Sequence, residues 1–346
     1  MGMVNNSWPA PGRLNATAIA DKFNAEISTA IDASVAANRG RPHLVGLLSN
    51  DDPAGEMYAK MTKRACEKIG VSYELRRPER TSLETELIAA NSDPTVHGIL
   101  TYYPVFGGGK DAYLRDVVSV EKDVEGLSHQ YCYSLYHNIR YLEGHKKCVL
   151  PCTPLACVKV LEHFGAYDAS KPVGKQLEGR TAIVYNRSEV VGRPLAAMLA
   201  NDGARVFSVD EFGLLLYTAG AVSGTIKVDE TSLTTEEALA LADIVIGGVP
   251  SKNFKIPAAS IRAGAICINV SQHMNFGDGT DARCALVPAV GKVTIAILAR
   301  NLLRLFENYH APPVRSVGPR VAAAAACTAI AVAAAAAAAL ILGKPR

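Results

Sequence analysis

The sequence has little net charge, and this narrows the class of protein. The net charge is +3 over 346 residues. Four basic residues and no acid follow residue 310, so residues 1–310 carry a net charge of −1. A nucleic-acid surface normally needs clustered Lys and Arg, so no nucleic-acid partner is expected. A chain of this length is expected to form two domains.

The cysteines contain no C-x-x-C pair. The nearest group, Cys148, Cys152 and Cys157, has neither the spacing nor the histidines of a zinc site. The opening M-G-M-V-N-N-S-W shows no secretory signal. We therefore expect free thiols, no bound metal and a cytoplasmic protein.

The C-terminal segment lacks charge and is dominated by alanine. Residues 321–343 are uncharged, and 14 of these 23 residues are Ala. A helix of this length could just cross a bilayer, but alanine gives little drive for insertion. We expect residues 321–346 to be an appendage outside the fold, with a membrane anchor as the alternative.

Alternating strand and helix patterns over the first 150 residues predict a parallel sheet with helical crossovers. An Asp-Pro pair begins one predicted helix and Gly70 ends it. The triple glycine in P-V-F-G-G-G-K-D, residues 104–111, is expected to form a loop. The predicted strands are residues 43–49, 71–77 and 96–105, and the predicted helices are residues 14–38, 51–70 and 81–92.

A second alternation begins near residue 180 and indicates another α/β unit of Rossmann type. P-C-T-P, residues 151–154, precedes a predicted helix over 155–165. An amphipathic helix over 293–309 is expected to return to the first unit. The predicted class is α/β, with two mostly parallel sheets and flanking helices. The predicted domains are 1–150 with 295–320, and 151–294.

One stretch of the second unit has the order of a dinucleotide site, although it lacks G-x-G-x-x-G. Residues 181–210 are predicted as strand, loop, helix, strand and a final Asp210. Backbone N–H groups at a helix start bind pyrophosphate. In this loop Ser188 offers a hydroxyl, Gly192 allows close approach, and Pro194 suits a first helical turn.

Asp210 favours NAD, because an acid there binds the adenosine ribose and repels a 2′-phosphate. Arg187 and Arg193 keep NADP open, since either could accommodate that phosphate. The plain alternative is an ordinary strand-to-helix turn with an incidental acid.

Five segments occur in one order over residues 13–308. N-R-S-E-V-V-G-R-P (186–194) resembles G-R-S-x-x-V-G-x-P, with Asn186 for the first glycine. E-K-D-V-E-G-L (121–127) resembles P-x-K-D-V-D-G, and P-C-T-P matches outright. A-D-I-V-I-G-G-V-P (242–250) resembles A-D-I-V-x-x-x-G-x-P, and V-P-A-V-G-K-V-T (287–294) is similar to V-P-G-G-V-G-P-M-T, one residue shorter. Together they resemble the methylenetetrahydrofolate dehydrogenase/cyclohydrolase family.

The resemblance implies a cytoplasmic homodimer of one-carbon metabolism and purine biosynthesis, with a tetrahydrofolate held between two domains. It implies oxidation of 5,10-methylenetetrahydrofolate to the methenyl form by hydride transfer to a nicotinamide. Many members of the family then hydrolyse the methenyl form to 10-formyltetrahydrofolate.

Two departures from the family concern the hydrolysis. The family has Y-x-x-x-K on one helix, but the fourth residue after Tyr58 is Thr62. Lys60 and Lys63 are rotated from Tyr58 by about 200° and about 140°. Tyr102 stands where the family has a glutamine that supports the lysine. Hydride transfer needs mainly alignment, whereas hydrolysis needs water activation, so we expect little or no cyclohydrolase activity. This combination, with NAD as cofactor, resembles the monofunctional branch found in fungi.

The resemblance also assigns roles. Tyr58 and Glu125 are the predicted catalytic residues: Glu125 accepts hydrogen bonds from the pterin edge, and Tyr58 lines the pterin. Asp123 is expected to stabilise the turn beside it, and Tyr102 either packs on the folate or fills space. The substrate-side set is Tyr58, Tyr102, Asp123, Glu125, Pro288 and Gly291. The cofactor-side set is Asn186, Arg187, Ser188, Val191, Gly192, Pro194, Asp210, Gly248, Val249, Pro250 and Thr294.

Two alternatives stay open. One is a bifunctional NADP-dependent enzyme in which Lys60 or Lys63 replaces the missing lysine. The other is a folate- and nucleotide-binding protein without turnover. A dehydrogenase of small acids is disfavoured, because it has no need of K-D-V-E-G and P-C-T-P.

Overall fold

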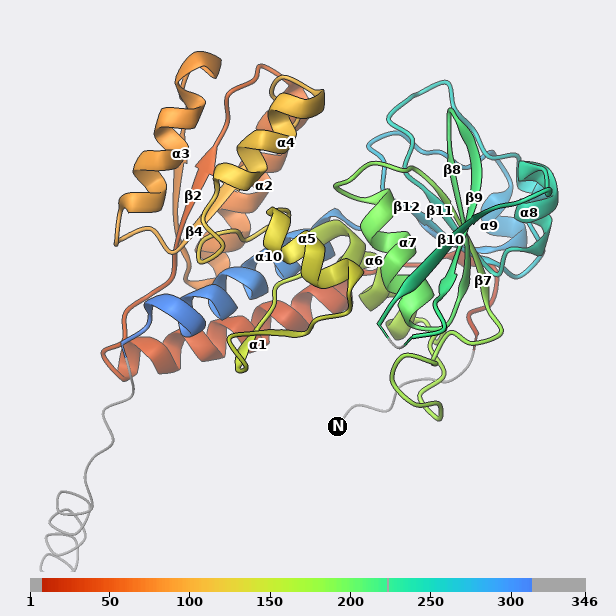
Figure 1. Ribbon diagram of the computed structural model, residues 1–346, viewed down its shortest axis with the longest axis horizontal. Helices are drawn as coiled ribbons and strands as arrows, with labels where there is room; N and C mark the ends of the chain where they lie inside the picture. The colour runs from red at the N-terminus through yellow and green to blue at the C-terminus, as the bar shows by residue number, and fades with distance from the viewer. Residues whose placement is uncertain (1–7, 223, 313–346) are drawn as a thin grey trace, which may run out of the picture.

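The computed structural model describes residues 8–222 and 224–312, and it forms two α/β lobes (Figure 1). The first lobe contains a parallel three-stranded sheet in the order β3-β2-β4, which confirms the predicted strands. Its strands are β2 (His43–Leu47), β3 (Ser72–Arg76) and β4 (Gly98–Thr101). Its helices are α1 (Thr17–Ala36), α2 (Pro53–Ile69), α3 (Leu83–Ser92), α4 (Gly108–Val117) and α5 (His129–Tyr136), with a 3₁₀ turn at Arg80–Ser82 and a small hairpin of β5 (Tyr141–Leu142) and β6 (Lys146–Lys147).

Helix α2 has the ends that the sequence predicts. The Asp52 side chain accepts a hydrogen bond from the Ala54 amide at 3.1 Å, and Pro53 is the first helical residue. Gly70 closes the helix in the left-handed conformation, with φ of 83°. These caps set the two ends of α2, the helix that carries Tyr58.

The triple glycine corrects one expectation, because α4 begins inside it at Gly108. The buried Asp111 carboxylate accepts hydrogen bonds from the amides of Val105, Phe106 and Gly107 at 2.9–3.0 Å. A side chain one turn into the helix thus satisfies the amides that precede it. The glycines therefore form a helix start rather than a loop.

The second lobe contains an eight-stranded sheet in the order β1-β13-β12-β11-β7-β8-β9-β10. Its central strands are parallel, as predicted, but β9 and β10 form an antiparallel hairpin that the sequence analysis missed. The strands are β1 (Gly12–Arg13), β7 (Thr181–Tyr185), β8 (Arg205–Asp210), β9 (Gly213–Ala219), β10 (Ile226–Glu230), β11 (Ile244–Gly247), β12 (Ile266–Asn269) and β13 (Ala285–Val287). The helices are α7 (Gly192–Asn201), α8 (Thr235–Leu241) and α9 (Thr280–Arg283), with a 3₁₀ turn at Ala258–Ser260.

The N-terminal segment differs from the predicted division. Strand β1 pairs in parallel with β13, and the Trp8 indole donates to the Gly264 carbonyl at 2.6 Å. Residues 8–13 therefore lie on the second sheet, although the sequence places them with the first unit. Two residues of strand are too short to carry a clear periodic signal.

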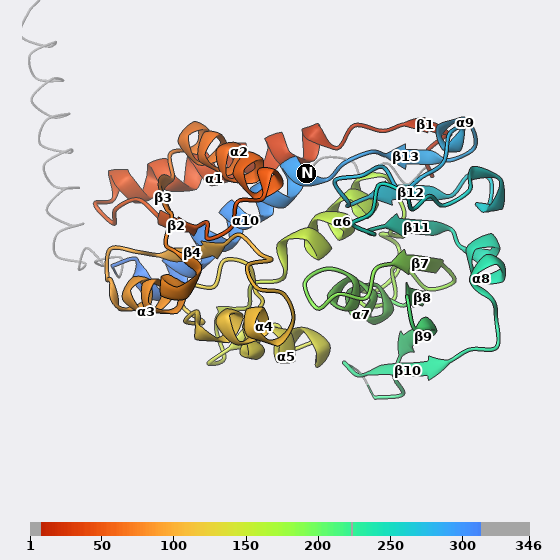
Figure 2. The same ribbon diagram turned by 90° about the horizontal axis from the view of Figure 1, so that it is seen from above.

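Two helices connect the lobes. Helix α6 (Cys152–His163) starts three residues earlier than predicted, so P-C-T-P forms its first turn. Helix α10 (Gly291–Leu305), followed by a π-helical turn (Phe306–His310), packs against α1 and α6. Seen from above, α10 runs beside α1 from the second lobe into the first, as expected for a returning helix (Figure 2).

Among the described residues, no helix has both the length and the hydropathy required to cross a bilayer. The predicted alanine-rich appendage, residues 321–346, lies outside the described residues.

Candidate active site

A cavity of about 140 Å³ lies where α2, the turn at Asp123, the first turn of α6, the loop before α7 and the start of α10 meet. It brings together three predicted site residues: Tyr58, Glu125 and Thr294. The remaining lining residues have no role predicted from the sequence. The full lining is Tyr58, Glu125, Leu127, Pro151, Cys152, Thr153, Val190, Thr294 and Leu298.

Glu125 is half-buried and lines the cavity. Burial, with the nearby charge of Asp123, raises the pKa of Glu125 to about 8. The next residue, Gly126, has φ of 66°, and a Cβ there would lie 3.0 Å from the Leu150 carbonyl carbon. The turn that carries Glu125 therefore packs directly on the backbone that precedes P-C-T-P.

Asp123 stabilises this turn from within. Its carboxylate accepts hydrogen bonds from the amides of Glu125, Gly126 and Ser128 at 2.8–3.1 Å, and it does not line the cavity. These contacts agree with the role of turn residue expected from the motif, and the place of Asp123 in the substrate-side set stays a prediction. The preceding Lys122 is also buried, and its ammonium donates to the carbonyls of Ala90, Asn91 and Asp93.

Thr62, which carries no amine, occupies the position of the family's lysine. Thr62 is fully buried, and its hydroxyl donates to the Tyr58 carbonyl one turn back at 2.9 Å. The Tyr102 ring packs edge-on against Tyr58, with centroids 5.9 Å apart, and its hydroxyl is 2.9 Å from that of Tyr73. Tyr102 is 5% exposed and does not line the cavity. Its geometry supports the space-filling alternative over direct contact with a ligand.

Neither candidate replacement lysine lies at the cavity. Lys60 is exposed on α2. Lys63 is also exposed, with its ammonium 4.0 Å from the Glu67 carboxylate. Both lie on faces of the helix away from Tyr58, as their spacing predicts.

The loop between β7 and α7 is organised by Asn186. Its side-chain oxygen accepts hydrogen bonds from the Ser188 amide at 2.8 Å and the Gly192 amide at 3.1 Å, and its amide donates to the Gly248 carbonyl at 2.8 Å. A Cβ on Gly192 would lie 1.9 Å from the Asn186 carbonyl oxygen, so only glycine fits there. Asn186 thus ties this loop to the one after β11.

Arg187 and Asp210 form an ion pair at 2.9 Å. The Arg187 guanidinium also donates to the carbonyls of Ser208 and Gly213 at 2.7 Å, so it bridges the turn between β8 and β9. Arg193 instead pairs with Glu189 in an exposed position. Asp210, the acid predicted to bind the ribose, is therefore paired with Arg187, one of the two arginines predicted to accommodate a 2′-phosphate.

The remaining predicted residues surround these loops. Val191 and Pro194 lie at the start of α7, and a Cβ on Gly248 would lie 3.1 Å from the Asn186 Cβ. Pro288 accepts a hydrogen bond from Asn269, and Gly291 is the first residue of α10. Pro288 and Gly291, predicted on the substrate side, do not line the cavity, and neither do Val249 and Pro250, predicted on the cofactor side.

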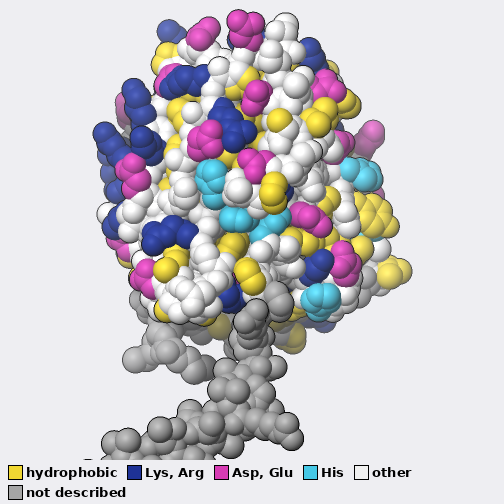
Figure 3. Space-filling view, turned by 90° about the vertical axis from the view of Figure 1, so that its left-hand side faces the viewer, with side chains coloured by type: hydrophobic (Ala, Val, Ile, Leu, Met, Phe, Trp, Pro, Cys, Tyr) yellow, Lys and Arg dark blue, Asp and Glu magenta, His cyan; other side chains and the backbone are white. Residues whose placement is uncertain are grey.

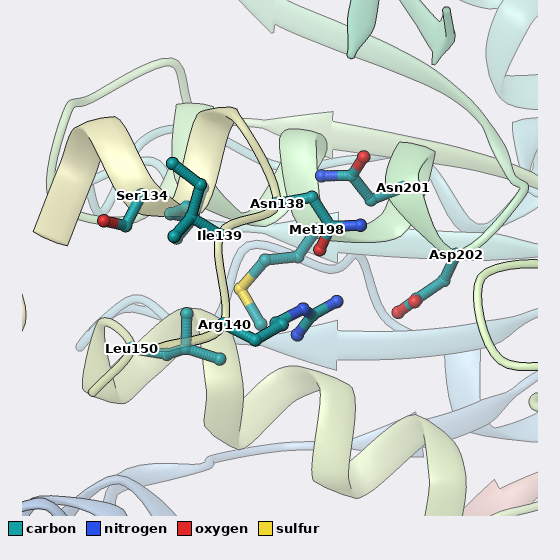
Figure 4. Close-up of a pocket in the computed structure, with 9 residues that line it drawn as sticks. Ser134, Asn138, Ile139, Arg140, Leu150, Met198, Asn201 and Asp202 are labelled. Atoms are coloured by element: carbon teal, nitrogen blue, oxygen red, sulfur yellow. The ribbon is translucent and has the colours of Figure 1, made fainter. Parts of the chain in front are cut away.

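Two other hollows contain neither Tyr58 nor Glu125. One, of about 30 Å³, lies between α5 and α7 near Arg140 and is too small for a folate or a nucleotide (Figure 4). The second is an open groove of about 670 Å³ between α5, α7 and the β9–β10 hairpin. The chemistry-bearing side chains converge elsewhere, at the cavity between the lobes.

Histidines gather on one end face, where charges of both signs are interspersed (Figure 3). His97 accepts a hydrogen bond from the His43 amide at 2.9 Å, and its ring lies 5.2 Å from that of His310. Burial lowers the pKa of His97 to about 4, so it stays neutral. In the described part of the chain, no three His, Cys, Asp or Glu side chains group as metal ligands, and the seven cysteines there are free thiols.

Comparison with known proteins decides the family. A model of the tetrahydrofolate dehydrogenase/cyclohydrolase catalytic domain matches residues 14–125, and a model of the NAD(P)-binding domain of the same proteins matches residues 151–310. The chain belongs to the tetrahydrofolate dehydrogenase/cyclohydrolase family. The resemblance seen in its motifs and the expected α/β class are confirmed.

Within this family, the chain is 50% identical over 300 residues to a protein of Dictyostelium discoideum named methylenetetrahydrofolate dehydrogenase [NAD(+)], covering 86% of this chain and 95% of that protein. A bifunctional protein FolD of Leptospira biflexa is 28% identical, covering 88% and 96%. The structure of the NAD-dependent 5,10-methylenetetrahydrofolate dehydrogenase of Saccharomyces cerevisiae superposes with a TM-score of 0.82 at 46% identity, covering 86% of this chain and 98% of that one.

Proposed function

We propose that this protein is an NAD-dependent methylenetetrahydrofolate dehydrogenase of one-carbon metabolism. One observation carries the proposal: Tyr58 and Glu125 share a cavity with Thr294, at the junction of the two lobes. Proteins that bear this name are about half identical to the chain over most of its length.

The residues of the cavity position the folate. Glu125 accepts hydrogen bonds from the N–H groups of the pterin edge, and Tyr58 packs beside the ring. The methylene carbon then loses a hydride, and the positive charge spreads over the two folate nitrogens bonded to it. No proton leaves in this step, so no general base is required.

The second lobe fits a dinucleotide. A Cβ on Gly192 or Gly248 would press against Asn186, so both glycines keep the loop before α7 close to the loop after β11, beside a helix start of the kind that binds pyrophosphate. When bound, NAD accepts the hydride. Asp210 would bind the adenosine ribose, and its pairing with Arg187 leaves that cation engaged rather than free for a 2′-phosphate. NAD is therefore favoured over NADP.

The proposal includes little or no cyclohydrolase activity. Hydrolysis of the methenyl cation requires a group that activates water, and a positioned lysine contributes roughly 100- to 10,000-fold to such proton transfers. Here Thr62 bonds to its own helix, while Lys60 and Lys63 are exposed. The bifunctional alternative has no amine placed to support it at the cavity lined by the described residues.

The finer expectations belong to the same proposal. They are a homodimer, a cytoplasmic location, a role in purine biosynthesis, and a division into a folate-binding unit (1–150 with 295–320) and an NAD-binding unit (151–294). The two family models, over residues 14–125 and 151–310, support a boundary near residue 150, whereas the pairing of β1 with β13 places residues 12–13 on the sheet of the NAD-binding unit.

The test is a set of initial rates with 5,10-methylenetetrahydrofolate and either NAD or NADP. We expect NADH formation, with NAD preferred. Binding of both ligands without turnover would instead favour the catalytically silent alternative.

A further inference from the structure

Asn301 is a buried polar residue just behind the cavity. It lies on α10, seven residues after Thr294 and three after Leu298, which both line the cavity. This spacing places all three on one face of the helix. Asn301 itself is 1% exposed and does not line the cavity.

The Asn301 amide joins two segments that are distant in the sequence. Its Nδ2 donates to the Val124 carbonyl and to the Leu150 carbonyl, each at 2.9 Å. Val124 immediately precedes Glu125, and Leu150 immediately precedes Pro151, so each acceptor is next to a cavity residue. The same Nδ2 lies 3.6 Å from the sulfur of Cys152, which donates to the Val124 carbonyl at 3.4 Å.

The side-chain oxygen of Asn301 makes no hydrogen bond of this kind. Asn301 Oδ1 is buried and has no hydrogen-bond partner among the described residues. A buried polar atom without a partner is unfavourable, and an apolar side chain of similar size would avoid it. An asparagine at this position is therefore understandable mainly through the two carbonyls that its Nδ2 joins.

We propose that Asn301 is a positioning residue of the folate site. It holds the turn that carries Glu125 at a fixed distance from the first turn of α6, so that the carboxylate meets the pterin edge. Gly126 is packed against Leu150 at the same junction, which makes the spacing sensitive to small shifts. The inference rests on the proposed function, because it assigns Asn301 to the binding of that substrate.

The test compares Asn301→Leu with Leu305→Ala. Leu305 is a fully buried residue of the same helix outside the cavity, so its truncation controls for loss of stability. We expect Asn301→Leu to raise both the KM for methylenetetrahydrofolate and the calorimetric Kd for tetrahydrofolate by about ten-fold. The KM for NAD should stay within about two-fold. Leu305→Ala should lower Tm and leave the KM for the folate unchanged.

Asn301→Ser serves as a milder second variant if Asn301→Leu does not fold. A single hydroxyl can donate to only one carbonyl, so an intermediate rise in the folate KM is expected. A lower Tm with an unchanged folate KM, or equal rises in the KM of both substrates, would overturn the inference.

Failure of the proposed function gives a different result. An unmodified protein that binds tetrahydrofolate without turnover would contradict the dehydrogenase, yet the Kd comparison would still decide the role of Asn301. An unmodified protein that does not bind tetrahydrofolate would overturn both.

Discussion

The two walls of the cavity, each taken together with the residues packed behind its lining, differ in how far they depart from the family pattern. On the nucleotide wall, the loop before α7 keeps its hydroxyl, its glycine and its proline, and the one replacement, Asn186, bonds within the loop. On the folate wall, buried Thr62 and Tyr102 stand where the family has a lysine and a glutamine. The loop proposed to align the cofactor thus keeps the family pattern, whereas the residues that the family pattern would use to activate water are replaced.

The chemistry of the folate wall agrees with this division. Burial raises the pKa of Tyr58, Tyr73 and Tyr102, that of Tyr73 to about 12, so the three phenols stay neutral near pH 7. Neutral phenols pack and donate hydrogen bonds but do not act as bases. This agrees with the proposal that the folate wall aligns the folate for hydride loss and supplies no group for proton transfer.

The largest effect is expected from Glu125→Gln on the folate wall. The amide keeps the size but loses the charged acceptor for two pterin N–H groups, so kcat/KM for the folate should fall by about 100-fold or more. Glu121→Gln, an exposed change in the same motif, is the matched control. Unchanged kinetics in Glu125→Gln would remove Glu125 from the site.

Gly192→Ala is the corresponding change on the nucleotide wall. The new Cβ would clash with the Asn186 carbonyl oxygen, so the loop must open and the KM for NAD should rise by about ten-fold or more. Tetrahydrofolate binding by calorimetry should be unaffected. Gly109→Ala, where the Cβ meets open space, is the control. A loss of folate binding equal to the loss of NAD binding would show that the walls are not independent.

The pH dependence should belong to the folate wall. The pKa of Glu125 is raised to about 8, so the carboxylate that accepts from the pterin is depleted below that pH. We expect kcat/KM for the folate to rise by up to about ten-fold per pH unit below pH 8 and then level off. The profile of Glu125→Gln should be flat, and a slope that persists in it would point to another group.

The same ionisation affects stability. The folded protein keeps the Glu125 proton to about pH 8, whereas the unfolded chain releases it near 4.5. The folded state binds more protons in this window, so this group lowers the free energy of unfolding as the pH rises through it. Denaturant unfolding of the protein and of Glu125→Gln at pH 5 and pH 8 measures this contribution.

A smaller effect is expected from Asp210→Ser. The change removes the partner of Arg187, whose guanidinium then becomes available to a 2′-phosphate. The ratio of kcat/KM for NADP to that for NAD should rise by about ten-fold, with little change in the folate KM. An unmodified protein that already prefers NADP would contradict the role of Asp210.

Local signals in the sequence predicted most of the fold. The continuous apolar runs of β7, β11 and β12 and the capping residues of α2 are such signals, and their elements formed as expected. The β9–β10 hairpin was missed because its outer strand is largely exposed and polar. The start of α4 depends on one carboxylate, Asp111, which accepts from three amides four to six residues earlier, and the triple glycine between them favours a loop in the sequence pattern.

The site was predicted where residue type carries chemistry. Glu125 and Tyr58 could be named from motifs, and they do share a cavity. Leu127 and Val190 line it as well, but an apolar residue has no signature that distinguishes a lining position from the core. Asn301 acts through contacts with residues more than 140 positions away, so only the tertiary structure reveals it.

The most direct test of the difference between the walls is the rate at which the purified protein hydrolyses 5,10-methenyltetrahydrofolate. We predict a rate equal to the spontaneous one in the same buffer, in a preparation that reduces NAD with methylenetetrahydrofolate, and no change in Lys60→Ala or Lys63→Ala. Hydrolysis well above the spontaneous rate that disappears in either lysine variant would contradict the account.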